Sequence, residues 1–188
     1  MKLTNSKASI LGIGLMLLAT LLFPFANVIS KTLTLTFSVL FIIWVRFFVA
    51  SIIGIPLSMY LYRHKGLGEI QYGRHIIRTI IMLGYVSFVL LALSQIPIAD
   101  TMGAFFISPI VATILAVFVL KEAINRIKII SAVMGFSGTL ILLQPGVSMN
   151  IGVIYALIGG ILSGIFLVMT RKVGLTTPPV MTMTIQSI

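Results

Sequence analysis

Gly12–Lys31, GIGLMLLATLLFPFANVISK, is an apolar run with the length of a membrane-spanning helix. Gly152–Arg171, GVIYALIGGILSGIFLVMTR, repeats the same interval between a glycine and a terminal cation. At the same offset along the chain, Leu35-Thr36 matches Leu175-Thr176. The chain therefore contains the start of a second copy of its own beginning. Because we count five apolar segments between the two starts, the second copy is predicted to be inverted in the bilayer.

The composition indicates that lipid is the solvent of this chain. Hydrophobic residues make up 59% of it, charged residues 9%, and the mean hydropathy is +1.20. A soluble domain of this length carries roughly 25% charged residues. The fold class we predict is an all-α, polytopic membrane helix bundle. Its six full spans are expected at 8–31, 37–62, 76–96, 98–120, 126–144 and 151–171, with a partial seventh beginning at Pro178-Pro179.

These spans are predicted to belong to two repeats, one complete and one truncated. Residues 8–146 are predicted to form a first, complete five-helix repeat. Residues 150–188 are predicted to form the truncated start of an inverted second repeat. The second copy ends close to its own beginning, so the sequence predicts that the chain is a fragment of a longer protein.

The positions of the 13 lysines and arginines predict the orientation of the chain. With the N-terminus in the cytoplasm, all but two of them lie at cytoplasmic ends of spans, Arg78 of the third span included. Lys31 then lies at the outer end of the first span, and Arg46 falls within the second. This distribution accounts for the net charge of +10 without nucleic acid as a partner.

Small residues and prolines recur at helical spacing within the spans. Gly160-x-x-x-Gly164 in the sixth span predicts close packing between helix backbones. Pro24 and Pro109 lie in the middle of spans, where proline frees a backbone carbonyl and kinks a helix. Such a carbonyl either lines a cavity or belongs to a static kink, and the sequence leaves both alternatives open.

Arg46 is the most informative candidate for a binding residue. It lies about 14 Å into the second span at 1.5 Å per residue, where a cation costs at least about 2.5 kcal/mol. Its alternatives are a contact with a carboxylate-bearing substrate and a structural bond to a neighbouring helix. We add Asn27, Tyr85 and Ser108 as residues expected to line a central cavity, although each is also suited to helix packing.

Enzymatic chemistry and bound cofactors are not expected. The chain has no cysteine, and its two histidines, His64 and His75, do not form a metal-ligand pattern. Gly135-Phe136-Ser137-Gly138 matches the G-x-S-G pattern of intramembrane serine proteases. A serine nucleophile needs a base, and both histidines are predicted near the loop between the second and third spans, out of its reach.

Several short segments form a recognisable set, namely Ala99-Asp100, Pro109, Leu120-Lys121-Glu122, Gly135-Phe136-Ser137-Gly138, Leu142-Leu143-Gln144-Pro145-Gly146 and Arg46-Phe47. Together they resemble the EamA-type transporters of the drug/metabolite transporter superfamily. The resemblance implies ten helices in two inverted five-helix repeats, with alternating access around a central cavity. It also implies a carrier in the bacterial inner membrane for small organic metabolites, and the pattern is similar to that of S-adenosylmethionine uptake carriers.

Two functions follow as expectations. The first is a membrane transporter of small organic metabolites, with amino-acid or S-adenosylmethionine-like substrates, no cofactor and no metal. The alternative is a non-transporting membrane remnant of a truncated gene. The expected partners are the lipid bilayer, a small-molecule substrate, and either a second copy of the chain or a missing C-terminal half.

Overall fold

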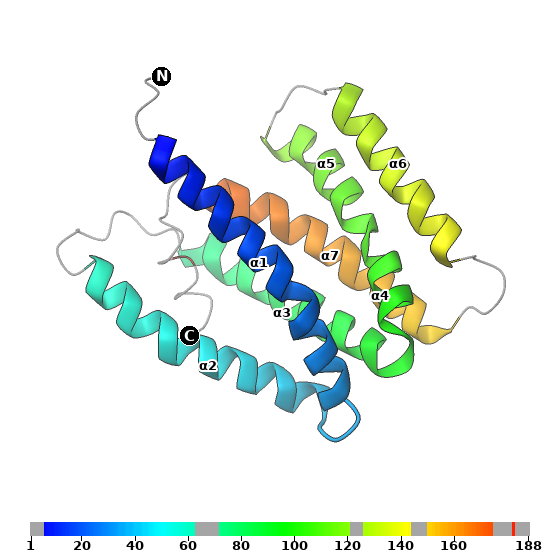
Figure 1. Cartoon of the computed structure of the whole chain (residues 1–188), viewed down its shortest axis with the longest axis horizontal. Helices are drawn as coiled ribbons and strands as arrows, with labels where there is room; N and C mark the ends of the chain where they lie inside the picture. The colour runs from blue at the N-terminus through cyan, green and yellow to red at the C-terminus, as the bar shows by residue number, and fades with distance from the viewer. Residues whose placement is uncertain (1–5, 63–71, 121–125, 144–149, 175–181, 183–188) are drawn as a thin grey trace.

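A computed structural model describes residues 6–62, 72–120, 126–143, 150–174 and 182, and the regular elements in this part of the chain are helices (Figure 1). The all-α class is therefore confirmed. The elements are α1 (Ser6–Leu33), α2 (Val39–Tyr62), α3 (Tyr72–Gln95), α4 (Ile98–Phe105), α5 (Ile107–Leu120), α6 (Arg126–Leu143) and α7 (Ile151–Gly174). The predicted start at Pro178-Pro179 lies outside the described residues.

Five segments in the described part of the chain are long and apolar enough to cross a membrane. They are Gly12–Leu33, Val39–Leu57, Gly73–Gln95, Ile98–Leu120 and Ile151–Gly174. The predicted span at 126–144 forms the helix α6 but is not among these five. The fold is thus a polytopic helix bundle, while the division into two repeats stays a prediction.

Helix α7 forms the centre of the bundle, where it packs along α3 and against α4 and α5 (Figure 1). Small residues make this close approach feasible. Ala156 is fully buried, and a β-carbon added at Gly164 would lie 2.7 Å from the Val111 Cβ. One added at Gly160 would lie 3.1 Å from the Phe105 carbonyl oxygen. The close packing predicted from Gly160-x-x-x-Gly164 is confirmed.

The fourth predicted span is one apolar segment but two helices. Pro109 lacks the N–H that would bond the carbonyl of Phe105 four residues earlier, and α4 ends there. The N–H of Phe106 donates instead to the carbonyls three and four residues before it, at 3.1 and 3.2 Å. The freed Phe105 carbonyl lies against Gly160 of α7. Pro24, by contrast, leaves α1 a single helix.

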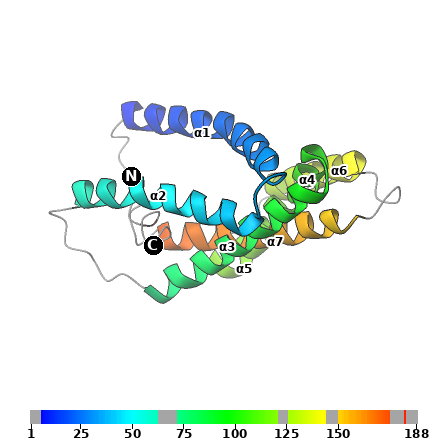
Figure 2. The ribbon, with the colours of Figure 1, turned by 90° about the horizontal axis from the view of Figure 1, so that it is seen from below.

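Helices α1 and α2 are attached to this centre mainly at one end. They meet at the turn between them and diverge toward the N-terminus of α1 in both views (Figures 1 and 2). On α2, Ile42 and Ile43 are buried against Leu90 and Leu93 of α3. Residues 12–25 of α1 are exposed throughout. The two helices therefore form a pair that is anchored at one end and open at the other.

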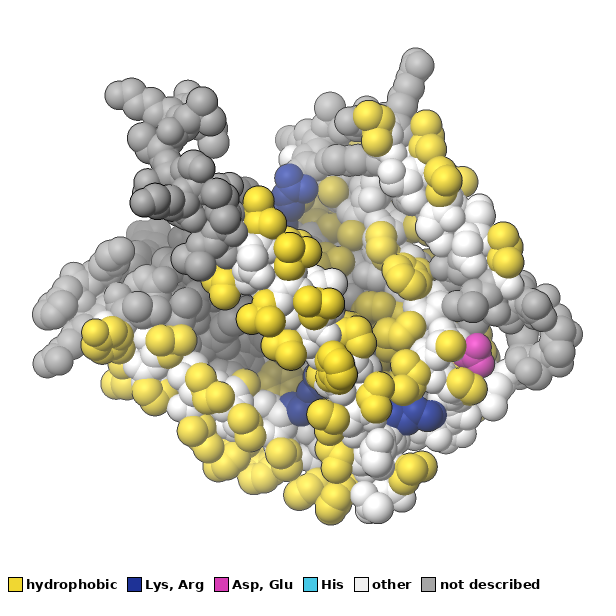
Figure 3. All heavy atoms as spheres, viewed as in Figure 1, with side chains coloured by type: hydrophobic (Ala, Val, Ile, Leu, Met, Phe, Trp, Pro, Cys, Tyr) yellow, Lys and Arg dark blue, Asp and Glu magenta, His cyan; other side chains and the backbone are white. Residues whose placement is uncertain are grey.

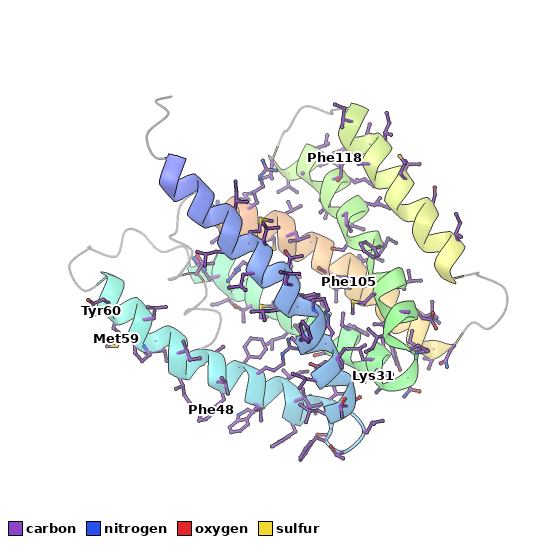
Figure 4. All side chains as sticks on the ribbon, viewed as in Figure 1. Lys31, Phe48, Met59, Tyr60, Phe105 and Phe118 are labelled. Carbon is purple, nitrogen blue, oxygen red and sulfur yellow. The ribbon has the colours of Figure 1, made fainter. Side chains whose placement is uncertain are left out.

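The exposed surface of the described residues is largely apolar. Hydrophobic side chains are spread over the described part of the face drawn in Figure 3, which is hollowed beside α1. Phe48, Met59 and Tyr60 lie on α2 and point away from the other helices (Figure 4). Apolar side chains on the outside and polar ones inside are what a bilayer solvent requires.

Candidate substrate site

Arg46 lies on α2 in the second candidate span, and its side chain is exposed. Its Nη1 donates to the Ser30 Oγ of α1 at 3.5 Å, which is long for a hydrogen bond. The Ser30 hydroxyl itself donates a hydrogen bond to the Ala26 carbonyl oxygen at 2.7 Å. The guanidinium of Arg46 therefore reaches from α2 to α1, and this is one bond for a group that has five N–H donors.

Tyr85 lies near the middle of α3, where it meets α7. Its ring centroid is 5.3 Å from that of Phe166, in a tilted arrangement typical of aromatic pairs. The positive charges of Arg46 and Arg78 both act on the Tyr85 hydroxyl. Of the four predicted site residues, Arg46 and Tyr85 thus interact electrostatically from different helices, without a hydrogen bond between them.

The other two predicted site residues lie in helix contacts. Asn27 is only 5% exposed, and its Nδ2 donates to the Met102 Sδ at 3.8 Å, joining α1 to α4. Ser108 is 2% exposed, and its Oγ donates to the Ser163 Oγ at 3.2 Å, joining α5 to α7. Each of these polar groups has a partner on a neighbouring helix, which is the packing alternative that the sequence left open.

Lys31 fixes the anchored end of α1. Its Nζ donates to the carbonyl oxygens of Leu93 and Ile96, at 2.6 and 2.7 Å, beside the end of α3 (Figure 4). These carbonyls belong to the last turn of a helix and the residue after it, where backbone acceptors lack intrahelical partners and a cation is favourable. The sequence placed Lys31 at the outer end of its span, but this clamp on α3 was not predicted.

Arg78 is buried, which the sequence reasoning did not predict. We expected it at the cytoplasmic end of a span beginning at 76. Because α3 begins at Tyr72, Arg78 lies in the second turn of this helix, and its side chain is 2% exposed. Its Nη1 donates to the Thr170 Oγ1 at 3.3 Å, and its Nη2 donates to the Thr182 carbonyl oxygen at 2.9 Å. Arg78 lies seven residues before Tyr85 and therefore on the same face of α3. This spacing was the sequence signal that could have indicated its burial beside Tyr85.

Phe166 of α7 is shared between Arg78 and Tyr85. The guanidinium carbon of Arg78 lies 5.3 Å from the centre of the Phe166 ring, within the range of a cation–π interaction. The same ring contacts Tyr85. Arg78, Tyr85 and Phe166 therefore form one group of contacting side chains. We call this group, together with Arg46 on α2, the cation–aromatic cluster.

Other chemistry finds little support in the described residues. No group of three or more His, Cys, Asp or Glu side chains that would hold a metal ion occurs among them. The Ser137 Oγ of the G-x-S-G pattern donates to the Val133 carbonyl oxygen of its own helix at 2.9 Å. A serine hydroxyl used in this way has the bond that serines commonly make inside apolar helices.

Comparison with known families supplies the remaining observation. The model of the EamA-like transporter family matches residues 10–144, which run from α1 to the end of α6. The match covers more than half of the 188 residues. No curated protein and no solved structure matches the chain. The resemblance indicated by the sequence motifs is confirmed at the level of the family.

Proposed function

Because the chain belongs to the EamA-like transporter family, we propose that it carries small organic metabolites across a membrane by alternating access. The family consists of transporters rather than enzymes, and the five membrane-capable segments fit a multi-pass protein. The membrane we propose is the bacterial inner membrane, with the N-terminus in the cytoplasm. The substrates we propose are amino-acid or S-adenosylmethionine-like metabolites.

Two features of the fold support alternating access. Helices α1 and α7 run in opposite directions in both views, as expected if they open two inverted repeats (Figures 1 and 2). The pair α1–α2 contacts the rest of the bundle mainly at one end. Carriers of this architecture move one group of helices against another around a central site.

The observation that carries the proposal at residue level is Arg46. A cation inside a membrane span is costly and is usually functional. Here its hydrogen bond to Ser30 is long, and its positive charge acts on the Tyr85 hydroxyl from a different helix. We therefore propose that Arg46 and Tyr85 contact the substrate, and that Asn27 and Ser108 line the cavity at its margins, where they also join helices.

The test is uptake into right-side-out membrane vesicles that contain the full chain. The panel includes radiolabelled S-adenosylmethionine, neutral amino acids and carboxylic acids. We expect at least one of them to accumulate above empty vesicles. Arg46→Gln should lower that uptake about tenfold or more, because a hydrogen bond to a charged group is lost.

Arg74→Gln provides the matched control. Arg74 is an exposed cation at the start of α3, so the variant removes the same charge outside the proposed site. It should retain uptake close to that of the unmodified chain. Absence of uptake for the whole panel, with the chain present in the vesicle membrane, would favour the non-transporting remnant instead.

A further inference from the structure

Arg78 is the starting point, because its charge is buried in an apolar bundle and has no acidic partner among the residues that the structure describes. Of the acidic side chains, the structure describes Asp100 alone, in the first turn of α4. Neither Arg78 nor Arg46 forms an ion pair with a described residue. A buried charge is stable only when it is paired or fully hydrogen-bonded. Both guanidinium groups therefore carry positive charge that the described side chains do not neutralise.

The hydrogen bonds of Arg78 leave one donor unused. Its two Nη atoms bond to Thr170 and to the carbonyl of Thr182, but its Nε is buried and has no hydrogen-bond partner among the described residues. An unused N–H on a residue that is 2% exposed carries a desolvation cost. A bound acceptor would remove that cost.

The surroundings of Arg78 define what kind of acceptor fits. Phe166 lies against the guanidinium, and Tyr85 lies against Phe166. From α2, Arg46 adds a second positive charge that acts on the Tyr85 hydroxyl. Guanidinium groups match the geometry of carboxylates, and aromatic rings pack on flat apolar bodies.

We propose that the cation–aromatic cluster, formed by Arg46, Arg78, Tyr85 and Phe166, binds the carboxylate of an organic anion that has a flat apolar body. This inference rests on the carrier function proposed above and names the substrate class of the same site. Arg78 supplies its Nε–H to the carboxylate, and Arg46 supplies the second positive charge from α2. The two aromatic rings hold the body of the anion.

The experiment measures binding of two probes to the full chain in lipid nanodiscs by equilibrium dialysis, with empty nanodiscs as the blank. Benzoate and benzamide have the same ring and nearly the same size, but only benzoate is an anion. The unmodified chain is expected to bind benzoate about tenfold more tightly than benzamide, or better. Equal affinity for the two probes overturns the proposal without any variant.

The variants locate the charge preference. Arg78→Gln and Arg46→Gln should each reduce the benzoate-to-benzamide ratio about tenfold, whereas Arg74→Gln should leave it unchanged. Arg78→Lys keeps the charge but lacks the Nε–H, so it should give an intermediate ratio. A structural role of Arg78 alone would lower the melting temperature of its variants but leave the ratio intact in those that fold. An unchanged ratio in both Arg46→Gln and Arg78→Gln overturns the proposal.

Binding and uptake separate this proposal from the function on which it rests. If benzoate binds as expected but no substrate of the panel is taken up, the carrier function fails and the anion site stands. If a neutral or cationic substrate is taken up while the benzoate preference is absent, the carrier function stands and the anion site fails.

Discussion

Helices α7 and α1 begin the two copies that the sequence predicts, yet the structure holds them very differently. At matching positions, Ala156, Gly160 and Gly164 of α7 correspond to Met16, Thr20 and Pro24 of α1. The first three are buried against α3, α4 and α5, whereas the last three are exposed. The smaller residues on this face of α7 thus go with packing along its whole length, whereas α1, with larger residues at the same positions, is held only at its end. Close backbone approach is the main source of helix association in lipid.

This difference divides the molecule into a packed unit and an attached pair. The unit consists of α3, α4, α5 and α7, which share buried small side chains such as Ala92, Ala104 and Ala156. The pair consists of α1 and α2, which carry Asn27, Lys31 and Arg46. Because Arg46 belongs to the pair and Tyr85 belongs to the unit, relative movement of the two would open or close the proposed site between them.

The largest expected effect comes from breaking the packed unit at Gly164. In Gly164→Leu, the new Cβ would lie 2.7 Å from the Val111 Cβ and 2.8 Å from the Ser108 carbonyl oxygen. Overpacking of this kind costs about 3 kcal/mol. We expect a clear loss of thermal stability in detergent, measured by the temperature at which the chain ceases to elute as a single species.

The matched control is Gly14→Leu on α1, where an added Cβ meets nothing within 4 Å. It should leave the melting temperature unchanged or slightly higher, because leucine favours helix more than glycine does. Equal loss of stability in the two variants would show that the packed unit does not differ from the attached pair.

A smaller effect is expected from releasing the clamp between the pair and the unit. Lys31→Met removes two hydrogen bonds from a charged donor to the Leu93 and Ile96 carbonyls. We expect the free energy of unfolding to fall by about 2 kcal/mol, because hydrogen bonds from a charged donor contribute more to stability than bonds between neutral groups. Thermal unfolding in detergent measures it, with Lys172→Met at the exposed end of α7 as the comparison. If both variants have the same melting temperature as the unmodified chain, Lys31 does not hold α1 in place.

Helix positions could be predicted from the sequence because a bilayer demands long apolar runs. The predicted spans lie within a few residues of the observed helices, and Pro109 gave the position of the break between α4 and α5. The family could also be recognised, from short motifs around Pro109 and Gly135. These features are local in sequence, so they need no knowledge of which helices touch.

The partners of individual side chains could not be predicted in the same way. The hydrogen bonds of Arg78 go to Thr170 and Thr182, which are 92 and 104 residues away in the chain. Rules that assign cations to span ends consider only the distance to the nearest apolar run, so they do not predict that the side chain of Arg78 is buried. Ser108 looked like a cavity residue, and its bond to Ser163 depends on how α7 packs.

The most direct test of the division into unit and pair measures distances between spin labels. The chain has no cysteine, so labels can be placed on cysteines introduced at exposed positions without other changes. One pair of labels, at Leu18 and Tyr60, reports the distance between α1 and α2. A reference pair, at Ile77 and Leu167, reports the distance between α3 and α7. We predict a broad, multi-component distance distribution for the first pair, which shifts when a transported substrate is added, and a single narrow one for the second. Narrow distributions for both pairs, unchanged by substrate, would contradict the account.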